Sequence, residues 1–518
     1  MTQIRKILGL PWFVILICFL PVLHFQASNF RLVPWDAGLA LSLLYVLAGV
    51  ALTAGLRPFT RSLAGAGLAA APLTAILVWG RFFGPLWSGI LFLVACCGAA
   101  AARSRPGWTP TVTLIANAAL AALVLQSGLA TALQRSGLDD PRPTDLFRTL
   151  PDLGENPAAG ELPDIYFIVV DGLGQPALLE RDFGLPVSET TGELGRLGFR
   201  FIERSNCNYS QTALSLASTL NLAPLQDLLD IRDPAGRNRQ VLARLVSDNR
   251  LVRALRNRGY RVATLPSGYP VSRLGRPDLR LEPTVRATFT DLYLLNEGIL
   301  ALVGPWLGKA PAVLGHRLHR ERVLFNLDHL GRIRNRMPAA EPCFVFTHIL
   351  APHPPFVLAA DGSPLDPGGA LFSFGDGTHW RNAQRPVPAD AVREYRRLYA
   401  GQARFVLDRL ERAVARILAT APRPPIIIVQ GDHGPGSRLD WDHPRASDLT
   451  ERMSIFNAWY LPPGFEHCFP QGTEAVDTFP ALLEGLFGSP QPDPAGGITF
   501  STMQAPFTFL ETVSGGAE

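Results

Sequence analysis

The feature that most limits the fold of this chain is a series of apolar segments in its first quarter. Five such segments cover residues 7–25, 37–56, 63–80, 86–102 and 111–133. Each is close to the roughly 20 residues that an α-helix needs to cross a bilayer. The first has no small-residue cleavage site and four more follow it, so an anchor is expected rather than a cleaved signal peptide. Residues 1–135 are therefore predicted to be a bundle of about five transmembrane helices.

Basic residues between these segments predict the orientation of the bundle. Most of them fall in alternate loops, namely Arg5, Lys6, Arg57, Arg61, Arg103 and Arg105, whereas the other loops carry Arg31 and Arg81. By the positive-inside rule the amino terminus is cytoplasmic and everything after the fifth segment is outside. In a bacterium this predicts a multi-pass protein of the inner membrane with a periplasmic or extracytoplasmic domain. The third and fourth segments are rich in Ala and Gly, with Pro72 inside the third and Pro85 directly before the fourth. Merging or losing one of them would place the part after the fifth segment in the cytoplasm.

Charge and cysteine content exclude two classes of function. A formal charge of +4 over 518 residues gives no reason to expect nucleic-acid binding. After the apolar quarter the cysteines are Cys207, Cys343 and Cys468, an odd number that leaves room for at most one disulfide, and no CxxC pair is present. A zinc site built from cysteines is therefore not expected.

The remainder of the chain has the pattern of an α/β domain. Residues 136–162 are rich in Pro, Asp and Gly and are predicted to be a linker. Beyond them, short apolar runs at 164–170, 260–265, 343–349, 425–430 and 455–461 alternate with helical segments such as 241–258 and 391–418. Buried strands alternating with amphipathic helices predict a largely parallel central sheet over residues 163–518.

Residues that can bind a metal follow three of these predicted strands. Asp171 follows the first, His348 and His353 belong to "CFVFTHILAPHPPF", and Asp432 and His433 follow "PIIIVQG". Ligands bind at the carboxyl ends of parallel strands, and carboxylates with imidazoles suit zinc or manganese. Taken singly, an Asp followed by Gly is also typical of a turn, and a strand histidine of a hydrogen-bonded core residue. The convergence of three strand ends favours a metal site.

A hydroxyl that such a metal could activate occurs in "NYSQTALSLASTLN". Thr212 stands at the start of an apolar, small-residue stretch that is predicted to be a buried helix. The positive end of a helix dipole favours an alkoxide and an incoming anion, so Thr212 is a candidate nucleophile. The alternative is that Thr212 is only the N-cap of this helix.

The order of these motifs resembles the alkaline phosphatase superfamily in its sulfatase-like branch. Within that branch the chain is most similar to membrane-anchored lipoteichoic acid synthases and lipid A phosphoethanolamine transferases. The resemblance covers about residues 163–488 and is carried by the strand ending in Asp171, "TALSLAS", "THILAPHPPF" and "IIVQGDHG". It implies an alkaline-phosphatase-like α/β domain after a membrane bundle.

The resemblance also implies roles for individual residues. Asp171, Thr212, Asp432 and His433 would bind one divalent metal ion, zinc or manganese, with Thr212 as the nucleophile. His353 and His348 would contact the phosphate oxygens of the substrate. Alternatively these two histidines, with His443, would form a site for a second ion.

Two departures from the family pattern limit what is carried over. The transferases commonly have Glu where this chain has Asp171, which is one methylene shorter. Formylglycine sulfatases need Cys-x-Pro-Ser-Arg at the nucleophile, whereas Cys207 is followed by Asn208, Tyr209 and Ser210. Sulfate-ester hydrolysis by that route is therefore not expected.

The implied activity is transfer of a phospho-headgroup of the phosphoethanolamine or phosphoglycerol type. The donor would be a phospholipid, the acceptor an envelope glycan or lipid, and the intermediate a phospho-threonine. Hydrolysis of an envelope phosphoester is the first alternative, and a non-catalytic membrane assembly protein is the second. The donor headgroup, the acceptor and the oligomeric state do not follow from the sequence.

Two segments between the motifs have open interpretations. Residues 291–308, "DLYLLNEGILALVGPWLG", would form either a core helix or an interfacial helix that helps a lipid headgroup reach the site. Residues 316–336 are rich in arginine and are expected to be a solvated helix face rather than a phosphate-binding strip.

Overall fold

The structure, a computed structural model, describes most of the chain in two compact units. The described residues are 7–29, 38–136, 141–154, 162–236, 239–285, 310–366, 373–382, 387–472, 474–488, 490 and 497–511. The first unit contains the helices before Asp139, and the second contains Asp140–Arg286, His316–Gly368 and Ser373–Glu518. The segment 291–308 lies outside the described residues.

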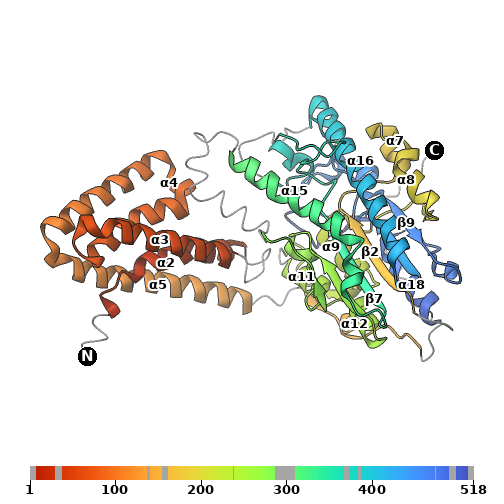
Figure 1. Cartoon of the computed structure of the whole chain (residues 1–518), viewed down its shortest axis with the longest axis horizontal. Helices are drawn as coiled ribbons and strands as arrows, with labels where there is room; N and C mark the ends of the chain where they lie inside the picture. The colour runs from red at the N-terminus through yellow and green to blue at the C-terminus, as the bar shows by residue number, and fades with distance from the viewer. Residues whose placement is uncertain are drawn as a thin grey trace. The chain divides into compact units, whose positions relative to one another are not determined.

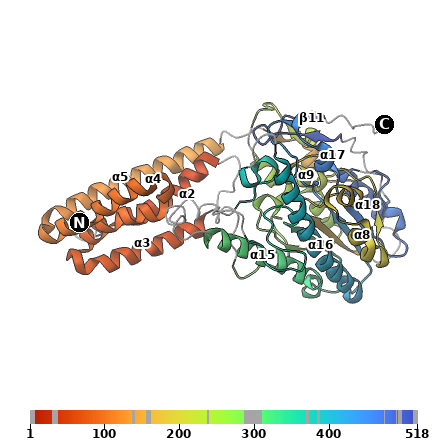
Figure 2. The same cartoon turned by 90° about the horizontal axis from the view of Figure 1, so that it is seen from above.

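The first unit is a bundle of apolar helices (Figures 1 and 2). Its helices are α2 (Trp12–Asn29), α3 (Leu39–Thr60), α4 (Leu63–Ser104) and α5 (Thr109–Ser136), and α2 contacts the other three. Asn117 of α5 joins this helix to the start of α2. Its side chain accepts a hydrogen bond from the amide of Phe13 and donates to the carbonyls of Leu8 and Leu10.

Helix α4 turns back on itself. A straight helix of 42 residues would be about 60 Å long, so its two ends would lie far apart. Instead, a Cβ placed on Gly65 would lie only 2.8 Å from the Cβ of Ala102. The two halves of α4 therefore run side by side, as expected for the separate third and fourth segments predicted from the sequence.

Among the described residues of the bundle, three stretches are long and apolar enough to cross a membrane. They are Leu41–Thr60, Leu86–Ser104 and Thr109–Ala130, while Trp12–Leu23 and Leu63–Trp79 are shorter apolar helices. The stretches lie within the second, fourth and fifth segments that were predicted to span, to within a few residues at their ends. The count of five spans stays a prediction.

The second unit is built on a seven-stranded sheet with the order β3-β9-β8-β2-β7-β5-β6. The central strands β8 (Pro425–Gln430), β2 (Asp164–Val170), β7 (Cys343–Ile349) and β5 (Arg261–Leu265) are parallel to their neighbours in this group. The short β6 (Leu279–Arg280) continues this parallel group at one edge. At the other edge β9 (Asn457–Tyr460) pairs antiparallel with β8 and with β3 (Arg200–Phe201). The largely parallel sheet predicted from the sequence is confirmed.

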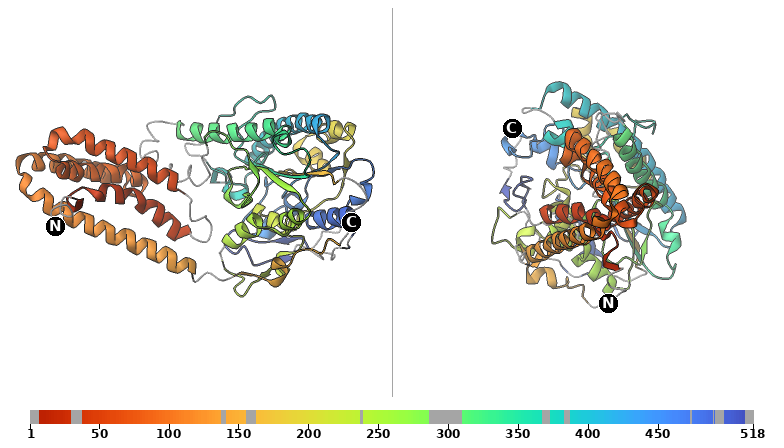
Figure 3. Two further views of the ribbon diagram at one scale, coloured as in Figure 1. Left: turned by 60° about the horizontal axis from the view of Figure 1, so that its bottom comes forward. Right: turned by 90° about the vertical axis from the view of Figure 1, so that its left-hand side faces the viewer.

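Helices cover both faces of this sheet (Figure 1; Figure 3, left). Side chains of β2 alternate between two cores, with Ile165, Phe167 and Val169 on one face and Tyr166, Ile168 and Val170 on the other. The first core is closed by α9 (Thr212–Thr219), α11 (Gln240–Ser247), α12 (Arg250–Asn257) and α18 (Thr478–Phe487). The second is closed by α7 (Pro176–Phe183), α8 (Val187–Arg196), α15 (Ala310–Leu330) and α16 (Ala389–Thr420).

Two expectations about this unit differ from the structure. The helix predicted over 241–258 is broken into α11 and α12, because Asn249 caps α12 by accepting a hydrogen bond from the amide of Val252. In the predicted linker, residues 141–154 are ordered on the second unit: Phe147 and Leu153 are buried in its core. Proline and aspartate content predicted the turns there but not this packing.

Candidate metal centre

The carboxyl ends of the three central strands bring the predicted metal-binding side chains together. Asp171 directly follows β2, His348 is the penultimate residue of β7, and Asp432 and His433 are the second and third residues after β8. The parallel register places Val169 of β2 opposite both His348 and Gln430, so the strands end at the same level. Gly172 makes the turn after Asp171 with a φ of +74°, and its amide donates a hydrogen bond to Asp432 Oδ1 at 3.0 Å.

His433 is oriented as a metal ligand. Its Nδ1 lies 2.9 Å from the carbonyl oxygen of Gly434, which can only accept a hydrogen bond, so the proton belongs on Nδ1. The lone pair of Nε2 then faces Asp171 Oδ1 at 3.4 Å and Asp432 Oδ2 at 3.6 Å. A lone pair facing two carboxylate oxygens is unfavourable unless a cation lies between them.

Two carboxylate oxygens at this centre lack hydrogen bonds among the described residues. Asp171 Oδ1 and Asp432 Oδ2 are both buried and neither has a hydrogen-bond partner there. Buried anionic oxygens without hydrogen bonds are strongly destabilising unless they are paired or bind a metal. These residues therefore fit a divalent cation.

Distances between the donor atoms agree with this fit. Ligand atoms about 2.1 Å from a tetrahedral zinc ion lie roughly 3.4 Å from each other. Thr212 Oγ1 lies 3.1 Å from His433 Nε2, and the two carboxylate distances to the same nitrogen are 3.4 and 3.6 Å. The three donors therefore lie at distances from His433 Nε2 that ligands of one ion would have.

Thr212 is the first residue of α9 rather than its N-cap. The N-cap is Gln211, whose side chain does not cap the helix but donates to the carbonyl oxygen of Ser501 at 2.9 Å. Every later residue of α9 is buried, which explains the uncharged sequence "ALSLAST". The alternative in which Thr212 serves only as a cap is therefore wrong, and its hydroxyl lies at the positive end of α9.

His348 contacts the opposite side of Asp171. Its Nε2 is 3.1 Å from Asp171 Oδ2, and its Nδ1 lies within about 3 Å of the hydroxyls of Ser267 and Ser272. Asp171, His348 and Asp432 form a second group whose potential ligand atoms lie within 4.8 Å of one another. His348 thus lies close enough to act on the same ion or on a neighbouring one.

His353 completes the other group, with Asp171 and His433. Its Nδ1 lies 2.6 Å from the carbonyl oxygen of Pro354 and donates to it, which leaves Nε2 for contacts at the centre. The same Nε2 is 3.8 Å from Asp376 Oδ2. His353 is partly exposed, unlike His348 and His433, and is therefore the histidine best placed to meet a substrate.

The charge states of the ligands suit metal binding. Burial and the nearby Arg452 guanidinium lower the pKa of His433, which keeps this imidazole in the neutral, metal-binding form. Burial opposes ionisation of Asp171, but His353 and His348 outweigh it and hold the pKa of Asp171 well below its usual range. At neutral pH the Asp171 carboxylate is therefore ionised and the His433 imidazole is neutral.

His443 is not part of this cluster. Its side chain is 62% exposed and its Nδ1 lies 3.3 Å from Asp440 Oδ1. Neither group of potential metal ligands among the described residues includes it. A second ion held by His443 together with His348 and His353 is therefore not supported by the geometry.

Asp376 and Arg452 support the centre, and sequence reasoning missed both. Arg452 Nη1 lies 2.6 Å from Asp376 Oδ2, and both side chains are almost fully buried. The same guanidinium donates to the carbonyls of Ser210 and Gly434, two residues before Thr212 and one after His433. No sequence signal marks this pair, because its two members lie 76 residues apart.

The arginine-rich segment after residue 316 also differs from expectation. His316, His319 and Arg322 lie three residues apart along α15 and are buried, not solvated. Arg322 packs against Gly268, in the loop that holds Ser267, and His319 and His353 interact electrostatically. Burial lowers the pKa of His319 to about 3, so it is neutral at this position.

All three free cysteines of the second unit are buried. Cys207, Cys343 and Cys468 form no disulfide. Burial raises the pKa of each thiol to about 12, so none is a reactive thiolate.

Comparison with known proteins finds similarity only at the level of structure. No protein-family model and no curated protein sequence matches the chain. Solved structures that it matches include lipooligosaccharide phosphoethanolamine transferase A, an integral membrane protein of Neisseria meningitidis, at 12% identity and a TM-score of 0.37, over 92% of each chain.

Two further matches cover about two thirds of this chain. One is the zinc complex of the periplasmic domain of EptC from Escherichia coli, at 13% identity and a TM-score of 0.35, over 70% of this chain and 92% of that one. The other is phosphonate monoester hydrolase of Agrobacterium radiobacter, at 15% identity and a TM-score of 0.40, over 68% and 78%. The matches include the kinds of protein that the motifs resemble. At these identities and TM-scores they carry no conclusion about activity, which has to come from the residues of this chain.

Proposed function

We propose that this protein is a metal-dependent phosphotransferase that moves a phospho-headgroup from a phospholipid to an envelope glycan or lipid through a phosphorylated Thr212. The observation that carries the proposal is the position of Thr212 Oγ1 at the start of α9, 3.1 Å from His433 Nε2 and beside two buried carboxylate oxygens that lack hydrogen bonds.

Asp171, Asp432, His433 and Thr212 would hold the metal ion, with His348 in contact with Asp171. A bound zinc or manganese ion would lower the pKa of the Thr212 hydroxyl and neutralise charge on the phosphoryl oxygens. One ion fits the four donors, and the group of Asp171, His348 and Asp432 is the place where a second ion would bind.

Thr212 is the group that forms the covalent bond. Its deprotonated Oγ1 attacks the phosphorus of the lipid headgroup, and the bond from phosphorus to the diacylglycerol oxygen breaks. Diacylglycerol leaves as the alcohol with the proton that Thr212 lost, and the phospho-headgroup remains on Thr212. In the second step an acceptor hydroxyl attacks the same phosphorus, the bond from phosphorus to Thr212 Oγ1 breaks, and the proton of the acceptor restores the Thr212 hydroxyl. The amino terminus of α9 stabilises negative charge in both steps, and His353 is placed to contact the phosphoryl oxygens.

A scaffold without catalytic activity does not account for this arrangement. Two buried carboxylate oxygens without hydrogen bonds destabilise a fold and have no structural use. Hydrolysis differs from transfer only in the second step, where water replaces the acceptor. The apolar first unit favours a lipid donor and hence transfer, because it keeps the chain where phospholipids are.

The test is covalent labelling of the full-length protein in detergent. The protein is incubated with zinc or manganese and a phospholipid that carries a labelled headgroup, and Thr212 peptides are examined by mass spectrometry. We expect the mass of the phospho-headgroup on Thr212, and loss of turnover in Thr212→Ala while about one metal ion per chain is retained.

The matched control is Ser215→Ala, one turn further along α9. Ser215 is a buried hydroxyl of the same helix, so its loss perturbs the packing of α9 without removing the nucleophile. Turnover should be close to that of the unmodified protein. Substantial turnover in Thr212→Ala would exclude the covalent mechanism, and a chain that binds no zinc or manganese would exclude the metal centre. Label found in water rather than on an acceptor would favour the hydrolase.

A further inference from the structure

One face of α16 contacts all three loops that follow the central strands at the metal centre. Tyr395, Tyr399 and Gln402 lie at positions i, i+4 and i+7 of this helix, so they share one face, and all three are buried. Tyr399 contacts the loop after β2, Gln402 the loop after β7, and Tyr395 the loop after β8. A single rigid element therefore connects the three loops.

Tyr399 fixes the turn that follows Asp171. Its hydroxyl donates a hydrogen bond to the carbonyl oxygen of Gly172 at 2.7 Å and accepts one from the amide of Gly174 at 3.1 Å. The amide of Gly172 in turn donates to Asp432 Oδ1, while Oδ2 of the same carboxylate is the oxygen without a hydrogen bond. One phenol therefore holds the residue through which Asp171 and Asp432 are connected.

Gln402 holds the segment that contains His353. Its Nε2 donates to the carbonyl oxygens of Pro352 and His353, each at 3.3 Å. Its Oε1 accepts hydrogen bonds from the amides of Val357 and Leu358 at 2.8 and 3.1 Å. Carbonyls can only accept and backbone amides can only donate, so these four partners also determine which end of the side-chain amide is the oxygen. The backbone of His353 is thus fixed from α16.

Tyr395 makes the third connection. Its hydroxyl donates to Asp376 Oδ1 at 2.7 Å and accepts a hydrogen bond from the amide of Gly436 at 3.2 Å. Asp376 is the partner of Arg452, and Gly436 lies three residues after His433. The loop that carries His433 is therefore held by α16 as well as by Arg452.

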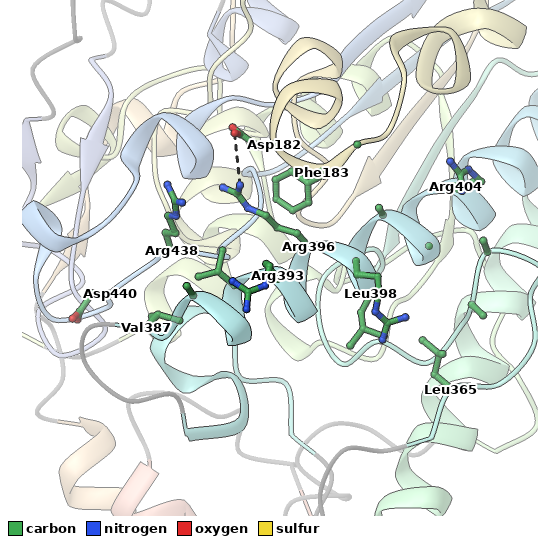
Figure 4. Close-up of a pocket in the computed structure, with 18 of the residues that line it drawn as sticks. Asp182, Phe183, Leu365, Val387, Arg393, Arg396, Leu398, Arg404, Arg438 and Asp440 are labelled. Carbon is green, nitrogen blue, oxygen red and sulfur yellow. Dashed lines mark ion pairs between the residues drawn. The ribbon is translucent and has the colours of Figure 1, made fainter.

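The other side of α16 has a different composition. It carries Arg393, Arg397 and Arg404, which line a groove (Figure 4). The side that contacts the three loops uses phenol and amide groups instead. These groups supply hydrogen bonds without a charge, so they do not compete with a metal ion for the two carboxylates.

We propose that this face of α16 positions the metal centre, with Tyr399 as the positioning residue for the two carboxylate ligands and Gln402 as the positioning residue for His353. The role of Gln402 rests on the proposed function, whereas the role of Tyr399 requires only that the centre binds a metal. Because the two side chains act on different loops, their variants should differ in which property they lose.

The first test is the zinc affinity of Tyr399→Phe in the full-length protein in detergent. The variant keeps the ring and removes only the hydroxyl, so the Gly172 turn loses two hydrogen bonds. We expect the affinity, measured by competition with a fluorescent chelator, to fall about tenfold or more, as is typical when a group that orients metal ligands is removed. In the metal-free protein, deuterium exchange at the amides of residues 172–174 should become faster.

The matched control is Tyr260→Phe. Tyr260 is buried, and its hydroxyl donates to the carbonyl oxygen of Pro163, at the opposite end of β2 from Asp171. Both variants lose a buried phenol hydroxyl, so their thermal unfolding midpoints should fall by similar amounts, but only Tyr399→Phe should lose zinc affinity. Unchanged affinity in Tyr399→Phe, or an equal loss in Tyr260→Phe, would overturn the role of Tyr399.

The second test is Gln402→Met, which keeps the length of the side chain and removes its hydrogen bonds. We expect zinc affinity close to that of the unmodified protein, and a kcat for the labelled phospholipid that falls about tenfold, because His353 loses its position beside the phosphoryl group. A loss of zinc affinity as large as in Tyr399→Phe would overturn the division of roles. An unmodified protein that binds zinc without turnover would overturn the proposed function and the role of Gln402 together, while the role of Tyr399 is decided by zinc affinity alone.

Discussion

Asp171 is one methylene shorter than the glutamate of the transferases that the motifs resemble, and its neighbours show why the shorter side chain is sufficient. Its two oxygens lie 3.4 Å from His433 Nε2 and 3.1 Å from His348 Nε2, so the carboxylate already bridges both imidazoles. The side chain is 2% exposed, and a longer one would have to displace a neighbour. The close approach of β2 to the histidines therefore lets the shorter side chain reach both imidazoles.

The residues of the centre were predictable from the sequence to different degrees. Asp171, Asp432 and His433 follow strands whose apolar runs mark their ends, and Thr212 opens a stretch without charge. Arg452 and Asp376 were not predictable, because a buried ion pair between distant positions leaves no local pattern. The resemblance implied His443 as a member of a possible second ion site, but in the structure its imidazole lies beside Asp440.

Arg452 is predicted to be the most sensitive position outside the metal ligands. Arg452→Met would leave the buried carboxylate of Asp376 without its partner and free the carbonyls of Ser210 and Gly434. Breaking a buried pair in this way costs about 3–5 kcal/mol of unfolding free energy. We expect a large drop in the thermal unfolding midpoint together with a lower kcat, because the carbonyls tied by Arg452 flank Thr212 and His433.

The control is the double variant Arg452→Met with Asp376→Asn. Removing both charges avoids the unpaired carboxylate, so the loss of stability should be much smaller than the sum of the two single losses. Additive losses in circular-dichroism melts would show that the pair does not act as a unit.

At the scale of elements, the central strands were predicted closely because short, uninterrupted apolar runs between polar residues favour a buried strand. β2, β7 and β8 are buried on both faces, which requires uninterrupted apolar runs, and their observed bounds equal the predicted ones. Helices were less well predicted. The break between α11 and α12 depends on one capping residue, Asn249, and α15 buries histidines and arginines that composition alone would expose.

Helix α16 contains a carboxyl group that should make the stability of the protein depend on pH. Half-burial, with repulsion from Glu193 and Asp408, raises the pKa of Glu411 from 4.5 to about 7. A group whose pKa is raised in the folded state stabilises it at low pH, and this stabilisation is lost as the pH rises between 4.5 and 7. Above pH 7 the charged Glu411 therefore destabilises the folded protein.

Glu411→Gln removes this effect because the amide cannot ionise. We expect the variant to be more stable than the unmodified protein at pH 8 by about 1 kcal/mol, a value reduced for solvent screening of a half-exposed group. At pH 4 the difference should vanish. The measurement is the thermal unfolding midpoint of both proteins in detergent over this range, and a difference that does not change with pH would contradict the assignment.

At the scale of the whole molecule, the first unit has the surface expected of a membrane bundle. Large apolar side chains lie on its exterior, among them Leu47, Leu86 and Leu125, which are 67%, 73% and 72% exposed. Exposed apolar surface of this kind is unfavourable in water and is covered when a bilayer surrounds the helices. The composition of the unit and its exposed surface therefore both indicate a membrane bundle. The number of spans depends on whether α4 crosses the membrane once or twice.

Contacts within the bundle gather its basic loops at one end. Gly65, near the start of α4, meets Ala102 near its end, and Gly67 approaches Pro11 before α2. The start of α2, the turn after α3 and the end of α4 therefore share one side, where the sequence places Arg57, Arg61, Arg103 and Arg105. The positive-inside rule assigns this side to the cytoplasm. Helix α5 starts on this side of the bundle. Its 28 residues are about 40 Å long, so α5 ends on the side away from the cytoplasm.

The threading of α4 is tested by reporter fusions to chains truncated after Arg105 and after Ser136. If α4 crosses twice, a fluorescent protein that matures only in the cytoplasm should be bright after Arg105 and dark after Ser136. A reporter hydrolase that is active only outside the cytoplasm should give the reverse pattern. A single crossing by α4 would exchange the two results, because each later segment would then face the other way. That outcome would put the second unit in the cytoplasm, away from any periplasmic acceptor, whereas the expected pattern puts the start of the second unit outside, where envelope glycans lie.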